Sequence, residues 1–114
     1  MPSTVTFDAG VDQRMLARLN KHRRELGLRE VKFGADQSKA ARECVKVNLD
    51  GHNFEHCGHE VLQTGGGSPE EIVDGWFWSP GHKQALTYDS STYAGAAFGT
   101  DAEGTVIAAI NIDY

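Results

Sequence analysis

Imidazoles and carboxylates gather in two short segments of this chain, and both residue types can bind cations or carry protons. Four of the five histidines lie within residues 51–60 and 79–82, and the first segment also contains Glu60. They are His52, His56, His59 and His82. Histidine changes charge near neutral pH and is a common nitrogen ligand of zinc. The pattern therefore predicts either a metal or proton-transfer site, or exposed polar histidines beside glycines.

The state of the two cysteines, Cys44 and Cys57, is left open by the sequence. They can form one disulfide or stay as free thiols, because two cysteines are too few to indicate a disulfide-stapled mini-protein. Cys57 follows His56 directly and could act as a nucleophile or a metal ligand. Cys44 lies among apolar helical residues, which is typical of a small buried side chain.

The composition indicates one folded domain over residues 1–114, with residues 1–9 as a polar lead-in. Hydrophobic residues make up 39% and charged residues 24% of the 114 positions, which is ordinary for a single folded domain. The net charge is −5, and the one dense basic run, residues 21–24, is expected on an exposed helix face. Nucleic-acid binding is therefore not expected, since it normally requires a broad basic surface.

Neither a membrane span nor an export signal is visible in the sequence. No apolar stretch approaches the roughly 20 residues that cross a bilayer. Residues 1–5 contain neither a basic leader nor a hydrophobic signal segment. We expect a protein that stays in the cytoplasm, leaves by another route such as a phage particle, or has lost a leader, and these alternatives stay open.

Hydrophobic spacing predicts two helices in the first half of the chain. Apolar residues recur at helical spacing over residues 10–26, and Gly27 follows where a left-handed C-terminal residue is favoured. A short strand is expected at residues 31–33. Asp36 is the expected N-cap of a second helix, which should end near residues 48–51.

The second half of the chain contains the clearest helix start and a predicted hairpin. Residues 68–71 read Ser-Pro-Glu-Glu, a capping box with proline at the first helical position, so a helix begins there. This helix should end at Ser79, where a second serine-proline pair can start a short helix. Trp78 should point away from the apolar face of the first of these two helices and could line a cleft. Residues 93–99 and 105–112 predict a hairpin whose second strand is apolar on both faces. The expected fold is α+β, a three-layer α-β-α sandwich with a central antiparallel sheet.

Residues 65–83 read Gly-Gly-Gly-Ser-Pro-Glu-Glu-Ile-Val-Asp-Gly-Trp-Phe-Trp-Ser-Pro-Gly-His-Lys. This long string resembles the bacterial pattern of the CAP superfamily, also called SCP-like, which includes cysteine-rich secretory, antigen 5 and pathogenesis-related type 1 proteins. Residues 19–28 and 54–62 are similar to further segments of the family, so the resemblance covers about residues 10–114. It is closest to the short bacterial and phage members.

The resemblance implies a cavity in which His56, Glu60 and His82 hold a divalent cation, often zinc, and could take part in catalysis. Two imidazoles and one carboxylate leave an open position for water, a geometry suited to zinc-dependent hydrolysis. The second acidic residue of the family falls near Ser79, which cannot supply a carboxylate, and Val61 replaces an asparagine of the motif. His52 and His59 are interpreted as auxiliary residues.

Three functions are considered, of which the first two follow from the resemblance and the third from the small size and the absent leader. The first is a binding or accessory module that holds a peptide, lipid, glycan or protein partner, with the His/Glu cleft as a metal-capable site. The second is a zinc-dependent, peptidase-like hydrolase, and the third is a structural component of a phage or secreted assembly. The missing second acid favours the binding module, and the sequence does not decide whether the chain is an enzyme. The family also implies an extracellular location.

Overall fold

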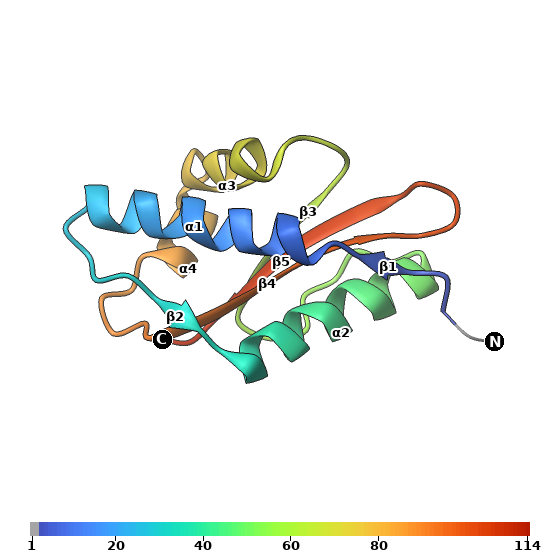
Figure 1. Cartoon of the computed structure of the whole chain (residues 1–114), viewed down its shortest axis with the longest axis horizontal. Helices are drawn as coiled ribbons and strands as arrows, with labels where there is room; N and C mark the ends of the chain where they lie inside the picture. The colour runs from blue at the N-terminus through green and yellow to red at the C-terminus, as the bar shows by residue number, and fades with distance from the viewer. Residues whose placement is uncertain (1–2) are drawn as a thin grey trace.

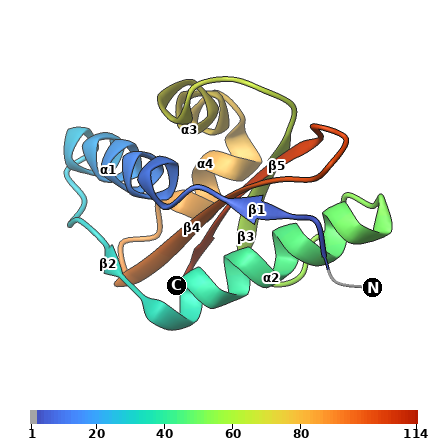
Figure 2. The same ribbon diagram turned by 45° about the vertical axis from the view of Figure 1, so that its right-hand side comes forward.

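The computed structural model describes residues 3–114 and arranges them in three layers (Figure 1). Its elements in chain order are β1 (Thr6–Phe7), α1 (Ala9–Glu25), β2 (Lys32–Phe33), α2 (Ala35–Gly51), β3 (Glu60–Thr64), α3 (Pro69–Phe77), α4 (Pro80–Leu86), β4 (Tyr93–Thr100) and β5 (Val106–Ile112). Helices α1, α3 and α4 cover one face of the sheet and α2 covers the other, as the turned view also shows (Figure 2). The predicted α-β-α sandwich is therefore confirmed. No helix within residues 3–114 is long and apolar enough to cross a membrane.

The central sheet is antiparallel apart from one short pairing. Within residues 3–114 it has five strands, in the order β1-β4-β5-β3, with β2 pairing in parallel with β4. Strand β1 lies in the segment that the sequence indicated only as a polar lead-in, and its Thr6 pairs with Thr100 of β4. Two residues are too few to show an alternating pattern, so this strand is defined by its partner and not by its own sequence.

The predicted hairpin of β4 and β5 is confirmed, and it lies at the centre of the sheet. On one face of β5, Ala108, Ile110 and Ile112 pack in the core beneath α1 and α3. On the other face, Ile107 and Ala109 pack in the core beneath α2. The two-faced apolar pattern of this strand therefore reflects burial on both sides.

Two helix ends match the sequence signals and one differs. Gly27 has the left-handed φ of 76° after α1, and the Ser68 and Glu71 side chains form the predicted capping box of α3. The predicted N-cap Asp36 is wrong, because α2 begins directly after Gly34, which makes no side-chain cap. The N–H of Gly34 still bonds to β4, so pairing with the sheet places the helix start. Asp36 lies in the first turn, where a carboxylate interacts favourably with the helix dipole.

The basic run at residues 21–24 is not wholly exposed, contrary to expectation, because Arg23 is completely buried. It continues the inward face of α1 that Met15 and Leu19 begin at a spacing of four residues. Its guanidinium donates to the backbone carbonyl oxygens of Arg29, Leu86 and Tyr88 at 2.9, 2.8 and 3.1 Å. The cation is therefore a buried connector between α1 and the end of α4.

Candidate functional site

The carboxylate of Glu60 organises the loop that carries His56. Glu60 begins β3, and its side chain is only 1% exposed. Oε1 accepts hydrogen bonds from the backbone N–H groups of Cys57 and Gly58 at 3.0 and 2.8 Å. Oε2 lies 2.7 Å from Nδ1 of His56. The structure thus brings two of the three predicted site residues into direct contact, and both carboxylate oxygens are already engaged.

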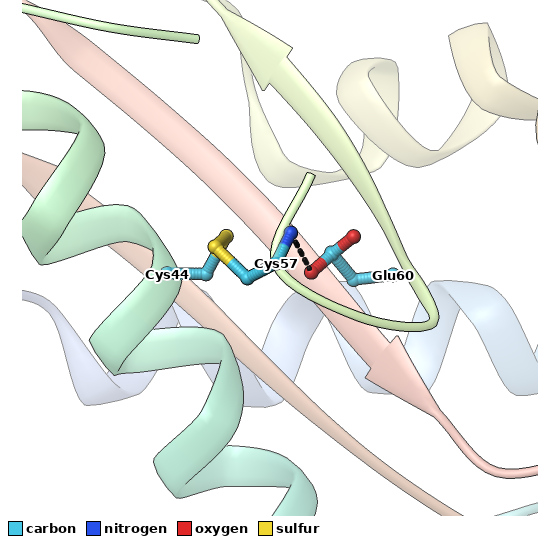
Figure 3. A group of neighbouring side chains, drawn as sticks. All are labelled: Cys44, Cys57 and Glu60. Atoms are coloured by element: carbon cyan, nitrogen blue, oxygen red, sulfur yellow. Dashed lines mark hydrogen bonds between the residues drawn. A yellow bond between two sulfur atoms is a disulfide. The ribbon is translucent and has the colours of Figure 1, made fainter. Parts of the chain in front are cut away.

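A disulfide between Cys44 and Cys57 joins α2 to this loop (Figure 3). It resolves the alternative that the sequence left open, and Cys57 is not a free nucleophile in this form. In Figure 3 the Glu60 carboxylate points toward Cys57, beside the disulfide. Both cysteines line a cavity of about 330 Å³ together with Glu43, Glu60 and Asn111. The loop, the disulfide and the carboxylate therefore form one compact unit with access to solvent.

His82 makes a different contact from the one predicted for a shared metal site. It lies in the first turn of α4, where its Nδ1 is 2.8 Å from Oγ of Ser79. Among residues 3–114, one group of three His, Cys, Asp or Glu side chains has ligand atoms within 4.8 Å of one another, and it does not include His82. Its members are Cys44, Cys57 and Glu60. As arranged, His56, Glu60 and His82 do not fit a divalent metal, and a shared zinc site there stays a prediction.

The two auxiliary histidines have structural contacts. His52 caps the C-terminus of α2 in the left-handed conformation, with φ of 53°. His59 Nδ1 lies 2.7 Å from the carbonyl oxygen of Ile112, and because a carbonyl can only accept, this nitrogen carries the proton. The His59 ring also lies 4.1 Å from that of Tyr114. Neither histidine belongs to a three-ligand group in the described part of the chain.

A groove of about 470 Å³ opens on the face formed by α1, α3 and α4. It is lined by Arg18, Lys21, His22, Glu25, Leu26, Asp74, Phe77, Trp78 and Lys83. Trp78 follows α3 and is 87% exposed, whereas Trp76 is 2% exposed and donates its Nε1–H to the carbonyl of Leu62. The predicted outward direction of Trp78 is therefore confirmed. Its indole offers a large uncovered apolar surface beside the groove.

Asp74 is the electrostatic centre of this groove. Arg18 of α1 binds its two oxygens through Nε and Nη2, both at 2.8 Å, and His22 Nε2 lies 2.6 Å from Oδ1. The His22 ring stacks on Phe77 with centroids 4.1 Å apart. The hydrogen bonds from Arg18, followed by that from His22, lower the pKa of Asp74 to about 2. This cluster was not predicted from the sequence, although Arg18 and His22 are four residues apart on one helix face.

The groove carries two lysines that form no ion pair within 4.0 Å in the described chain. Lys21 and Lys83 make no ion pair with any residue of the described chain, while the charge of Asp74 is compensated by Arg18. Glu25 is the remaining acidic residue in the lining. The surface is therefore locally basic on a chain whose net charge is −5.

Asp74→Asn is expected to destabilise the protein more at neutral than at acidic pH. Because the folded pKa lies below the ordinary 3.8, the carboxylate contributes stability above about pH 4, which is lost as the pH falls toward 2. Its side chain is 31% exposed, so solvent screening reduces the contribution to about 1 kcal/mol. Urea unfolding at about pH 6 and about pH 3 measures the free energy of unfolding of the variant and of the wild type. The gap between the variant and the wild type should narrow at the lower pH. Glu70→Gln, which removes an exposed ion pair with Arg14, is the matched control and should change little.

Comparisons with known proteins agree with this architecture. The profile of the CAP, or cysteine-rich secretory protein, family matches residues 16–112. An outer surface protein from Borrelia burgdorferi is 17% identical with a TM-score of 0.83, over 97% of both chains. The hookworm platelet inhibitor is 12% identical with a TM-score of 0.73, over 94% of this chain and 70% of that one. An extracellular protein containing a SCP domain from Bacillus anthracis is 15% identical with a TM-score of 0.67, over 91% of this chain and 41% of that one. No curated protein matches this chain at a significant level.

Proposed function

The chain belongs to the cysteine-rich secretory protein (CAP) family, and from this premise we propose that it is a binding module whose ligand occupies the groove between α1, α3 and α4. The observation that carries the proposal is the pairing of an uncovered indole, Trp78, with two unpaired cations, Lys21 and Lys83, around one concave surface. Its volume of about 470 Å³ is in the range of small-ligand and side-chain pockets.

The chemistry of the lining selects the class of ligand. Phe77 and Trp78 present aromatic surface, which favours a large apolar side chain. The two lysines favour a carboxylate beside it, because opposite charges across an interface orient the partner and speed association. We therefore propose that the ligand is an acidic peptide segment of a partner protein that carries at least one large apolar side chain.

The His/Glu loop supports this assignment over hydrolysis. Both oxygens of Glu60 are engaged by backbone N–H groups and by His56, so the observed role of the carboxylate is to hold the loop in place. A cation shared with His82 is a second proposal, which requires His82 to leave Ser79 and His56 to turn away from Glu60. Neither the zinc hydrolase nor the structural component of an assembly is favoured by an observation of its own.

Selection of phage-displayed random peptides on the native protein tests the proposed groove. Enriched sequences should combine acidic and aromatic residues, and synthetic peptides made from them should bind at least about tenfold more weakly to Trp78→Ala, a loss of about 1.4 kcal/mol. Lys21→Gln with Lys83→Gln should weaken binding and reduce its dependence on salt. Phe54→Ala is the matched control, since Phe54 is 51% exposed and lines a separate cavity beside α2. Equal binding to wild type and Trp78→Ala would contradict the proposal.

A further inference from the structure

We propose that a cavity at the outer edge of β4 binds a free apolar amino acid, whose ammonium contacts Asp12 and whose carboxylate contacts Arg42. The cavity has a volume of about 340 Å³ and is lined by residues of α1, β2, α2 and β4. No residue that lines it also lines the peptide groove. The inference therefore goes beyond peptide binding, and each of the two proposals can fail without the other.

The strand order leaves a short part of β4 uncovered on this edge. Strand β1 pairs with residues 99–100 of β4, and β2 pairs with residues 93–94. Within residues 3–114, no strand pairs with residues 95–98 on the same edge. Ala96 of this stretch lines the cavity, while α1 and α2 cover opposite faces of the sheet (Figure 2). The cavity is therefore bounded by both helical layers and by the edge of the sheet.

Asp12 supplies a buried acceptor to this cavity. The residue is 8% exposed, and its Oδ1 has no hydrogen-bond partner among the residues that the structure describes. Most buried polar atoms in folded proteins are hydrogen-bonded, because burying an acceptor without a donor is costly. Oδ1 is therefore an acceptor for a donor that a ligand brings. Since it belongs to a carboxylate, a charged N–H group is the donor that suits it best.

Arg42 of α2 places the opposite charge beside Asp12. Its Nη2 lies 3.4 Å from Oδ2 of Asp12, which is a long contact, and its side chain is 44% exposed. Within residues 3–114, the other N–H groups of this guanidinium have no hydrogen-bond acceptor. Arg42 can therefore rotate outward to admit a ligand to Asp12, and it keeps donors for an anionic group.

A ligand that carries both charges fits this pair better than a simple cation or anion does. In an amino acid the ammonium and the carboxylate are close together, so an ammonium beside Asp12 places the carboxylate beside Arg42. The four charges then alternate in sign, and each is hydrogen-bonded to its neighbour. Leu16 and Phe33 add apolar surface to the lining, and Phe33 is 65% exposed. An apolar side chain packed on these two residues would remove that surface from water.

Burial also makes the charge of Asp12 depend on pH. It raises the pKa of Asp12 from 3.8 to about 6, against the lowering effects of Arg42 of α2 and of the backbone N–H of Phe98 of β4. Asp8, which precedes α1, adds to the rise. The ammonium of the ligand requires the ionised form of Asp12. Affinity should therefore be highest above pH 6 and should fall as the pH drops below it.

Calorimetric titration of the full chain with L-leucine at about pH 7 tests the site. Isocaproate lacks the ammonium and isoamylamine lacks the carboxylate, so each should bind at least about tenfold more weakly than leucine. Asp12→Asn and Arg42→Gln should each weaken leucine binding by a similar factor. Lys46→Gln is the matched control, because Lys46 lies one turn further along α2, pairs with Asp50 and does not line the cavity.

The pH profile provides a second readout. The dissociation constant of leucine should be about tenfold larger at pH 5 than at pH 7 for the wild type, and it should stay constant for Asp12→Asn. This variant keeps the size of the side chain and removes a buried charge, so it should stay folded. Three results would overturn the inference: no binding at about 10 mM leucine, equal affinity for leucine and isoamylamine, and binding that Asp12→Asn leaves unchanged.

Discussion

Gly95→Ala is expected to destabilise the protein strongly, by about 3 kcal/mol or more. Gly95 lies in β4 beneath the first turn of α2, and an ideal Cβ built on it would lie 2.1 Å from the backbone nitrogen of Ser38 and 2.3 Å from its Cα. Neither neighbour is the end of a flexible side chain. Relieving this clash would require α2 to move away from the sheet, and this movement would also disrupt the pairing of β2 with β4. Overpacking commonly costs about 1–3 kcal/mol, and a clash with the backbone of α2, which cannot rotate away as a side chain can, places this variant at or above the upper end.

Urea unfolding followed by circular dichroism measures the effect of Gly95→Ala. The midpoint should fall by roughly a fifth to three fifths of its wild-type value or more, because about 3 kcal/mol is lost from a total of about 5–15 kcal/mol. Gly66→Ala is the matched control, since a Cβ there meets no atom within 4 Å. An unchanged midpoint for Gly95→Ala would mean that α2 does not approach β4 as closely as the structure shows.

Arg23→Met is expected to cost about 3 kcal/mol of stability or more, because it leaves three backbone carbonyl oxygens without their donor. Methionine replaces only the apolar stem of the arginine side chain, and it cannot donate to the three backbone carbonyls that the guanidinium satisfies. Each buried acceptor left without a partner costs about 1–3 kcal/mol. Burial lowers the pKa of Arg23 from its ordinary value, yet the group stays charged, because an arginine pKa lies far above neutral pH.

The matched control for this prediction is Arg24→Met, one residue further along α1. Arg24 is half exposed and pairs with Glu30 on the surface, so its loss should change stability little. Arg23→Lys should fall between the two, because an ammonium group cannot span three carbonyls arranged around a planar fork. A wild-type unfolding midpoint for Arg23→Met would show that the three carbonyls find other partners.

Arg23 also links stability to the proposed binding groove. It bonds the carbonyl of Leu86, the last residue of α4, and α4 carries Lys83 on the rim of the groove. We therefore expect partial destabilisation at Arg23 to weaken peptide binding more than an equal destabilisation at α2. This connection depends on residues 63 positions apart and has no local sequence signal.

The sequence by itself determined the features that depend on neighbouring residues. The capping box at Ser68 and the left-handed Gly27 involve atoms within one turn of chain. The β4–β5 hairpin follows from strand patterning around a short connection, and the two-faced apolar strand indicates layers on both sides. His56 and Glu60 meet because they are four residues apart in one loop, so the family motif was enough to select them.

The tertiary structure decided everything that depends on elements distant in sequence. The start of α2 at Gly34 and the strand β1 come from pairing with β4, and the burial of Arg23 comes from where α4 ends. The pairing of Asp74 with Arg18 requires α1 to lie beside α3. The separation of His82 from the His56–Glu60 pair depends on where α4 lies relative to the loop before β3. Residue types and spacing cannot specify such contacts, because many chain-distant arrangements satisfy the same local preferences and only the packing of the whole core selects one of them.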